Sequence, residues 1–248
     1  MKTLKQAAFP IALSMILTGC AGVGPKNTAS VYRGGEAASL EQLNSCINTK
    51  AVLGGAGGGV GAAILCKLTM KGASDAQIAA CALAGAAAGA YLAWRNAYGS
   101  CSKELNLVAA SSVQTQDFSA TAQRYSYNGQ GTLLQIEAVN LPNGNIVSGQ
   151  KIPAGIRYVL LTPNAQEAAL NVQRHMFCNN KDGKRELIFS NIDPYTEKAG
   201  TNQRDGFVQT APLPRDVGPI QCEMVVEVFA NGQRQEARSS FALVPGGA

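Results

Sequence analysis

The sequence predicts an α+β protein in which a Gly/Ala-rich antiparallel helical hairpin precedes an antiparallel β-sandwich. Two observations predict this division. Residues 39–103 consist largely of Ala, Gly and Leu, with small residues recurring at a spacing of four, which places them on one face of a helix. In residues 104–248 alanine becomes rarer, and short stretches of alternating polar and apolar residues follow one another between turn residues.

The hairpin is predicted from a mirror symmetry in the cysteine positions. The numbers of Cys46 and Cys101 sum to 147, and so do those of Cys66 and Cys81, so both pairs are centred on one point of the chain. A polar turn at 71–75 surrounds that point and contains residue types that end and restart helices. We therefore predict two antiparallel helices joined by the disulfides Cys46–Cys101 and Cys66–Cys81.

The same symmetry places small residues opposite small residues. Helices without large side chains in the way approach closely and gain dispersion contacts. Each interior glycine costs a helix about 1 kcal/mol relative to alanine, so packing or cross-links must offset that cost. The predicted packing residues are Gly54, Gly58, Ala62, Gly85, Gly89 and Ala93.

Local signals predict where the two helices begin and end. Ser39-x-x-Gln42 and Ser74-x-x-Gln77 both have the form of a capping box, which starts a helix. Gly99 is of the residue type that follows a last helical residue, so it predicts the end of the second helix.

The sequence is compatible both with a hairpin inserted in the membrane and with a soluble hairpin. The uncharged runs 51–66 and 76–94 would reach about 24 and 28 Å as helices, close to the ~30 Å hydrocarbon core. Tyr91, Trp94 and Tyr98 would lie at the open end of the hairpin, where aromatic side chains favour a water interface. Ala and Gly contribute little apolar surface, however, so a soluble hairpin is the alternative.

Residues 1–19 have the features of a signal peptide, with a basic start and an apolar run too short to span a bilayer. The motif Leu17-Thr18-Gly19-Cys20 resembles the lipobox of bacterial lipoproteins. The resemblance implies that signal peptidase recognises the first three of these residues and that Cys20 becomes a lipid-bearing N-terminus. Membrane lipid, attached as palmitate or a similar acyl chain, is thus an expected partner.

The lipid-anchored chain is expected at the outer membrane with a periplasmic domain, since Ala21 and not Asp follows the lipidated cysteine. Several acyl chains would anchor it stably. Residues 20–38 contain glycine and proline and are predicted to be a flexible tether.

The segment from Cys20 to Tyr98 also resembles the glycine-zipper envelope lipoproteins, in which two Gly/Ala-rich segments form a paired helical hairpin. Its paired cysteines depart from the pattern of that family. The motifs that carry the resemblance are Gly54-x-x-x-Gly58, Gly57-x-x-x-Gly61 and Gly85-x-x-x-Gly89.

The cysteine count and the net charge indicate the compartment of the protein and the ligands that it does not bind. An even six cysteines remain besides the lipidated one, which leaves Cys178–Cys222 as a third disulfide, and disulfides suit the periplasm or cell surface. No C-x-x-C occurs and His175 is the sole histidine, so no metal or other cofactor is predicted. Removing the signal lowers the formal charge from +5 to 19 − 16 = +3, too little to predict nucleic-acid binding.

Short predicted strands fill residues 104–248 and indicate a β-sandwich. The segment 164–174 is compatible with a strand or a short helix. The closing segment 218–244 resembles the last two strands of bacterial immunoglobulin-like domains, which implies an Ig-like fold. The predicted strands are 132–139, 155–162, 186–190, 220–228 and 236–244.

No catalytic motif is present, so the leading prediction is a non-enzymatic, lipid-anchored envelope protein whose sandwich binds an envelope or secretion-system protein. The first alternative is a homo-oligomeric membrane assembly or pore built from the hairpins. The second alternative is a lipoprotein that binds a small ligand or an inhibitor through the sandwich loops.

Overall fold

The computed structural model describes residues 30–31, 37–55 and 75–246 of the chain. The predicted lipobox, and with it Cys20, lies outside the described residues. The same holds for the predicted helix turn and for Gly58, Ala62 and Cys66, so the predicted Cys66–Cys81 disulfide is not among the described contacts.

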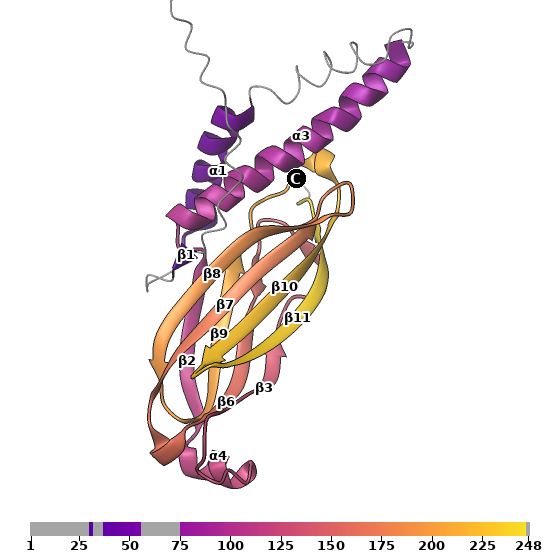
Figure 1. The fold of residues 1–248 in the computed structure, drawn as a ribbon. Coiled ribbons are helices and arrows are strands. Elements are labelled where there is room, and N and C mark those ends of the chain that lie inside the picture. Colours follow the sequence, from indigo (N-terminus) through magenta and orange to yellow (C-terminus); the bar gives the residue numbers. More distant parts are fainter. Residues whose placement is uncertain (1–29, 32–36, 56–74, 247–248) are drawn as a thin grey trace, which may run out of the picture.

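Two β-sheets face each other, with α1 and α3 at one end and α4 at the other (Figure 1). The helices are α1 (Leu40–Gly55), α3 (Asp75–Glu104) and α4 (Phe118–Arg124), with short 3-10 turns η1 (Pro163–Ala165) and η2 (Arg215–Val217). The six-stranded sheet has the order β1 (Ser30–Val31), β8 (Arg185–Glu197), β7 (Ala168–Asn179), β10 (Ile220–Ala230), β11 (Gln233–Val244) and β4 (Gly144–Val147). The five-stranded sheet has the order β2 (Val108–Gln116), β9 (Gly200–Gln209), β6 (Gly155–Leu161) and β3 (Leu133–Asn140), and β5 (Lys151–Pro153) also pairs with β9.

Alternation along the strands decides which side chains enter the core. In β10 the residues Cys222, Met224 and Val226 are buried, whereas Glu223 and Glu227 alternate with them on the outer face. The same alternation runs through β7. The strand predicted at 220–228 is thereby confirmed.

The turn between β10 and β11 is formed by residue types that favour a tight hairpin. Asn231 and Gly232 both have positive φ, at 48° and 80°, and join β10 to β11 in a two-residue hairpin. The ambiguous segment 164–174 is mostly strand, because η1 ends at Ala165 and β7 begins at Ala168. Strands are also present at the other four predicted positions, and β8 is much longer than predicted.

The predicted fold class is wrong. Strands dominate the described chain, and the Gly/Ala-rich helices do not form a hairpin domain that precedes a separate sandwich. Leu43 of α1, Tyr98 of α3 and core residues of both sheets belong to one continuous hydrophobic cluster. The sandwich is not purely antiparallel either, since β1 pairs with β8 and β4 with β11 in parallel.

Aromatic burial explains why the hairpin prediction failed. Tyr91, Trp94 and Tyr98 were expected at a water interface, but their exposed fractions are 2%, 3% and 0%. Trp94 stacks on Tyr98, and Tyr98 on Phe189 of β8, with ring centroids 5.6 and 6.4 Å apart. Large aromatic side chains bury far more area than a ridge of small residues, so α3 packs on the sheets.

A hydrogen bond adds specificity to this packing. The Tyr98 hydroxyl donates to the backbone carbonyl of Gln209 in β9 over 2.8 Å. Burial raises the pKa of the Tyr98 hydroxyl well above its usual value, so it stays a neutral donor. The helix therefore contacts strands of both sheets.

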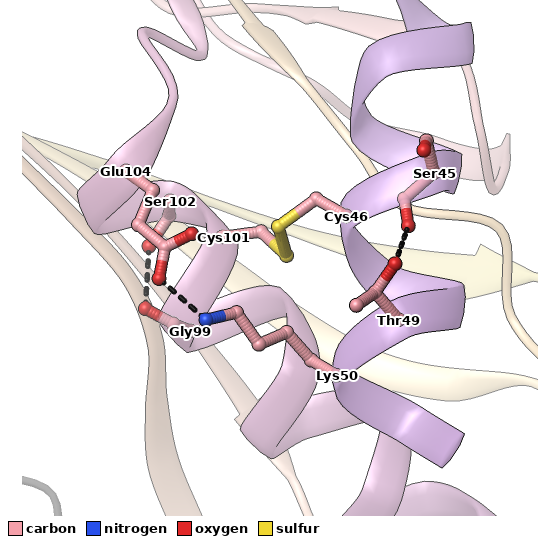
Figure 2. Close-up of a disulfide and its surroundings, with 8 residues drawn as sticks. All are labelled: Ser45, Cys46, Thr49, Lys50, Gly99, Cys101, Ser102 and Glu104. Carbon is pink, nitrogen blue, oxygen red and sulfur yellow. Dashed lines mark hydrogen bonds and ion pairs between the residues drawn. A yellow bond between two sulfur atoms is a disulfide. The ribbon is translucent and has the colours of Figure 1, made fainter. Parts of the chain in front are cut away.

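The C-terminal end of α3 also differs from the prediction. The helix does not end at Gly99 but continues to Glu104, so Cys101 is a helical residue. The disulfide Cys46–Cys101 joins it to α1, and Lys50 pairs with Glu104 at 2.7 Å across the same two helices (Figure 2). These cross-links hold the last turn beyond the glycine.

The start of α1 agrees with the prediction. The backbone N–H of Ser39 donates to the Gln42 side chain over 2.8 Å, and the backbone N–H of Gln42 donates to the Ser39 hydroxyl over 3.2 Å. This reciprocal pair is a capping box. Of the predicted hairpin-packing residues, Gly54 lies in α1, and Gly85, Gly89 and Ala93 lie in α3.

Candidate interaction surface on the six-stranded sheet

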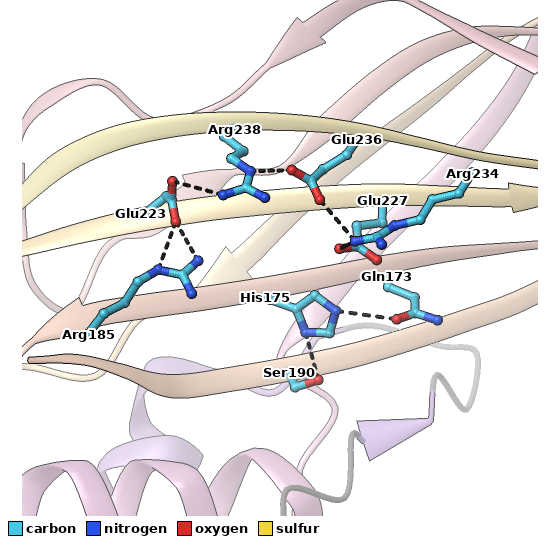
Figure 3. A network of polar contacts seen from close by, with 9 residues as sticks. All are labelled: Gln173, His175, Arg185, Ser190, Glu223, Glu227, Arg234, Glu236 and Arg238. Carbon is cyan, nitrogen blue, oxygen red and sulfur yellow. Dashed lines mark hydrogen bonds and ion pairs between the residues drawn. The ribbon is translucent and has the colours of Figure 1, made fainter.

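The outer face of the six-stranded sheet carries two neighbouring groups of polar side chains, a chain of ion pairs and a hydrogen-bonded group around His175, which together we call the charged face (Figure 3). It extends over four neighbouring strands, β8, β7, β10 and β11. Its members are Gln173, His175, Arg185, Ser190, Glu223, Glu227, Arg234, Glu236 and Arg238.

Strand register brings these residues together. Val225 of β10 lies opposite His175 of β7 on one side and Arg238 of β11 on the other. One row further along, Glu227 lies between Gln173 and Glu236. Because directly opposed side chains share one face of a sheet, each row presents groups from three strands to the same surface.

Ion pairs connect the rows. Glu223 accepts a hydrogen bond from Arg185 Nε over 3.1 Å, and Arg238 Nη1 lies 3.9 Å from its other carboxylate oxygen. Arg238 also pairs with Glu236, and this interaction lowers the pKa of the Glu236 carboxyl. Arg234 reaches Glu236 over 3.0 Å and also contacts Glu227.

The network is layered, with cations outermost. The side chains of Arg185, Arg234 and Arg238 are 46%, 55% and 55% exposed, whereas those of Glu223 and Glu227 are 25% and 12% exposed. The three arginines balance three glutamates in formal charge. An approaching molecule nevertheless meets guanidinium groups first, and the carboxylates lie beneath them.

Aromatic side chains support two of these arginines. The Arg185 guanidinium lies 3.4 Å from the centroid of the Phe177 ring, and that of Arg234 lies 5.6 Å from the centroid of Phe229. A guanidinium over an aromatic face is attracted by the ring quadrupole. The rings of Phe177 and Phe229 therefore favour the observed positions of these two guanidinium groups.

His175 is a half-buried member of the charged face. Its Nδ1 is 2.9 Å from the Ser190 hydroxyl, and its Nε2 is 3.3 Å from the Gln173 side-chain oxygen. Burial lowers the pKa of the imidazole, and the nearby Arg234 lowers it further while Glu227 opposes the shift. The ring is accordingly neutral at pH 7.

The Ser190–His175 contact does not have the form of a catalytic pair. The two residues lie directly opposite each other on neighbouring strands, on the outer face of a sheet. The group on the far side of the imidazole is the amide of Gln173, not the carboxylate that would stabilise an imidazolium. The contact is a cross-strand hydrogen bond that orients the ring.

A second polar cluster is buried between the sheets. Asp193 of β8 is 2.6 Å from Arg204 Nη2 of β9 and 3.5 Å from Arg174 Nη1 of β7, and all three side chains are at most 8% exposed. Arg174 Nε donates to the carbonyl of Ala154 over 3.1 Å. The Arg204 guanidinium covers the Tyr195 ring at 3.7 Å. This cluster ties three strands together across the sandwich.

An open groove of about 610 Å³ lies beside the Cys46–Cys101 disulfide, between α1 and the end of α3. The ion pair of Lys50 and Glu104 crosses it, and Thr49 is also part of its lining (Figure 2). It is open to solvent, and most of its lining surface is apolar.

The structure contains two of the three disulfides predicted from the sequence. Cys46–Cys101 links α1 to α3, and Cys178–Cys222 links β7 to β10 with a Cα–Cα distance of 4.0 Å. Cys178 and Cys222 are direct neighbours within one sheet, whereas the antibody-type disulfide joins two sheets. This position does not support the predicted Ig-like character of the sandwich.

Residues 30–31, 37–55 and 75–246 contain no group of three or more His, Cys, Asp or Glu side chains placed to hold a metal ion. Among the helices described in this part of the chain, none is long and apolar enough to cross a bilayer.

Sequence reasoning missed both polar clusters. Arg174 could have been found, because it occupies an inward position in the alternating series of β7, between Val172 and Met176. A charged residue at such a position predicts a buried partner. The charged face offered a weaker signal, since alternation in the sequence places Glu223 and Glu227 on one face of a strand but does not indicate their arginine partners, which come from other strands.

No protein-family model matches the chain, and a search of curated proteins also found no match. Among solved structures, a family 123 glycoside hydrolase from Clostridium perfringens is 12% identical with a TM-score of 0.32, covering 56% of this chain and 28% of that one. The alkylpurine DNA glycosylase AlkC from Pseudomonas fluorescens is 13% identical with a TM-score of 0.33, covering 71% of this chain and 50% of that one.

The CooA pilin subunit from enterotoxigenic Escherichia coli is 11% identical with a TM-score of 0.29, and the match covers 46% of this chain and 99% of the pilin. The chain thus spans half or less of the length of the two enzymes. Likenesses at these TM-scores carry no argument about function.

Proposed function

We propose that this protein is a non-enzymatic, lipid-anchored component of the bacterial cell envelope, and that its charged face binds an acidic surface on another envelope or secretion-system protein. Cys20 is the proposed site of lipid attachment. The outer membrane, with the β-sandwich in the periplasm, is the proposed location.

The lipobox-like motif ending at Cys20 supports the anchor. The two disulfides support the compartment, because the periplasm and cell surface are oxidising and the cytosol keeps thiols reduced. Neither observation depends on the charged face.

The layering of charge in the charged face is the observation that carries the binding role. Arg185, Arg234 and Arg238 are held in place by carboxylates and aromatic rings, so little side-chain freedom is lost when a partner docks. Guanidinium groups form bidentate hydrogen bonds with carboxylates, which makes an acidic protein surface the complementary partner.

Site-specific photo-cross-linking tests this function in membranes of the native bacterium. A photoreactive residue replaces Gln221, an exposed outer-face residue of β10 beside the charged face. We expect one protein adduct, and its yield should fall as salt rises, because screening weakens exposed charge interactions. Combined Arg185→Gln and Arg234→Gln substitutions should abolish the adduct.

Arg157→Gln is the matched control. Arg157 lies on β6 of the other sheet, pairs with Glu137 at 3.3 Å and is 46% exposed, much like Arg185. The adduct should persist in this variant. An adduct that is insensitive to salt and to the double substitution would contradict the proposed binding surface, and so would hydrolytic activity that disappears with His175→Gln.

A further inference from the structure

The two described disulfides differ in how well a reagent in solution can reach them. Cys178 and Cys222 are 1% and 4% exposed and lie opposite each other on β7 and β10, two central strands of the six-stranded sheet. Cys46 of α1 is partly exposed and lines the open groove between α1 and the end of α3 (Figure 2). Its partner Cys101 is fully buried. A thiolate that enters the groove therefore meets Cys46 first.

Helix α1 is attached to the rest of the described chain chiefly through α3. Leu43 reaches the shared core, and the backbone N–H of Ala38, just before the helix, donates to the carbonyl of Asn106 over 2.6 Å. The ion pair of Lys50 with Glu104 is exposed on both sides, and such pairs contribute little to stability. The Cys46–Cys101 disulfide is thus the covalent link among otherwise weak or few contacts.

The rest of the fold does not depend on α1. Tyr98 fixes α3 on the sandwich through the Phe189 ring and the carbonyl of Gln209. The strands of both sheets are held by their own ladders of backbone hydrogen bonds, and Cys178–Cys222 lies inside one of these ladders. Release of α1 would therefore be a local opening, not unfolding of the sandwich.

We propose that Cys46–Cys101 is a redox-sensitive link, and that its reduction by a dithiol releases α1 while the sandwich stays folded. Exposed disulfides are the labile ones in proteins, whereas buried structural ones resist reduction.

The exchange takes place in two steps. One thiolate of the dithiol attacks Sγ of Cys46, a mixed disulfide forms, and Cys101 leaves as a thiolate that takes up a proton. The second thiolate of the dithiol then attacks the dithiol sulfur of the mixed disulfide, which closes the oxidised dithiol and frees Cys46 as a thiol. Two electrons pass from the dithiol to the protein disulfide.

This inference is independent of the proposed function. It uses a different part of the molecule from the charged face, and it requires neither the lipid anchor nor an acidic partner. Opening of α1 would uncover the apolar side chains of Leu43 and Ile47, which now pack against the core.

Titration of the full chain with dithiothreitol, in detergent and without denaturant, tests the selectivity. The reaction is quenched with acid, and free thiols are alkylated after denaturation and located by peptide mass spectrometry. Cys46 and Cys101 should become alkylated at a dithiothreitol concentration at least about tenfold below that needed for Cys178 and Cys222. Reduction of both pairs over the same concentration range would overturn the proposal.

Hydrogen exchange tests the release of α1. At the concentration that reduces only Cys46–Cys101, the amides of 40–55 should lose protection, while those of β7 and β10 keep it. A variant with Cys46→Ala and Cys101→Ala should show low protection of 40–55 with and without dithiothreitol. Protection of 40–55 that survives reduction would overturn the release of the helix.

The matched variants Thr49→Glu and Thr49→Lys test the route of attack. Thr49 is exposed, lines the groove and lies three residues after Cys46, on the same face of α1. A carboxylate there repels an approaching thiolate and an ammonium group attracts it, so at low salt Thr49→Lys should be reduced at least about threefold faster than Thr49→Glu. Equal rates would overturn the assignment of Cys46 as the attacked residue.

Discussion

At the scale of single residues, the buried cluster of Arg174, Asp193 and Arg204 shows how a charge can be kept inside a β-sandwich. One carboxylate serves two guanidinium groups on different strands. Burial lowers the pKa of Arg174, whereas the facing Asp193 favours its charged form. The cluster thus depends on the central carboxylate.

Replacing that carboxylate is expected to destabilise the folded protein severely. Asp193→Asn leaves two buried guanidinium groups without a counter-charge, and breaking a buried ion pair in this way costs about 3–5 kcal/mol. Urea denaturation should show this loss in the free energy of unfolding. Arg157→Gln, which removes an exposed ion pair, should cost less than about 1 kcal/mol. Equal effects of the two substitutions would show that the buried cluster contributes little.

The lowered pKa of His175 predicts that the free energy of unfolding depends on pH. Its pKa lies below the usual 6.5 in the folded state, so the unfolded chain binds the proton more readily. The free energy of unfolding should therefore fall as pH drops below 6.5, and His175 should stop contributing to the slope below its folded pKa. Arg234 and Arg185 strengthen this effect, while Glu227 and Glu236 oppose it.

Denaturation of the wild type and of His175→Gln between about pH 5 and 7 measures that contribution. The variant cannot titrate at this position, so its stability should vary less with pH in this window. Parallel curves for the two proteins would mean that the imidazole has the same pKa in the folded and unfolded chains.

At the scale of elements, helix α3 belongs to the sandwich. The capping box at Ser39 and the alternation of β10 were predictable, because both signals lie within a few residues of sequence. The docking of α3 was not, since it depends on where Tyr98 meets Phe189 and Gln209, which are far away in the chain. Mirror-related small residues favoured pairing of the helices with each other, while the aromatic residues decided the packing.

The Cys46–Cys101 disulfide is the covalent link between α1 and the sheet-bound end of α3. The two cysteines are 55 residues apart, and closing such a loop stabilises the folded state by roughly 4 kcal/mol on the chain-entropy model. Cys46→Ala with Cys101→Ala should lower the thermal midpoint clearly. The helices should lose hydrogen-exchange protection before the strands do.

The charged face was only partly predictable at this scale. The outer positions of Glu223 and Glu227 follow from alternation within β10. Their arginine partners depend on the register of β11 and on the long hairpin between β7 and β8, which no local pattern determines.

At the scale of the whole molecule, one core joins two helices and two sheets into a unit with distinct outer surfaces. The six-stranded sheet presents ordered guanidinium groups, and the five-stranded sheet ends in a neutral strand. The proposed lipid anchor would concentrate those surfaces at a membrane, where weak contacts are effective.

Intact-mass spectrometry of the protein purified from its native membranes tests the envelope assignment most directly. We predict a chain that begins at Cys20 and carries the mass of acyl groups, and Cys20→Ala should abolish both the cleavage and the added mass. A mature chain that retains residues 1–19, or one that begins at an unmodified Cys20, would contradict the proposed lipid anchor.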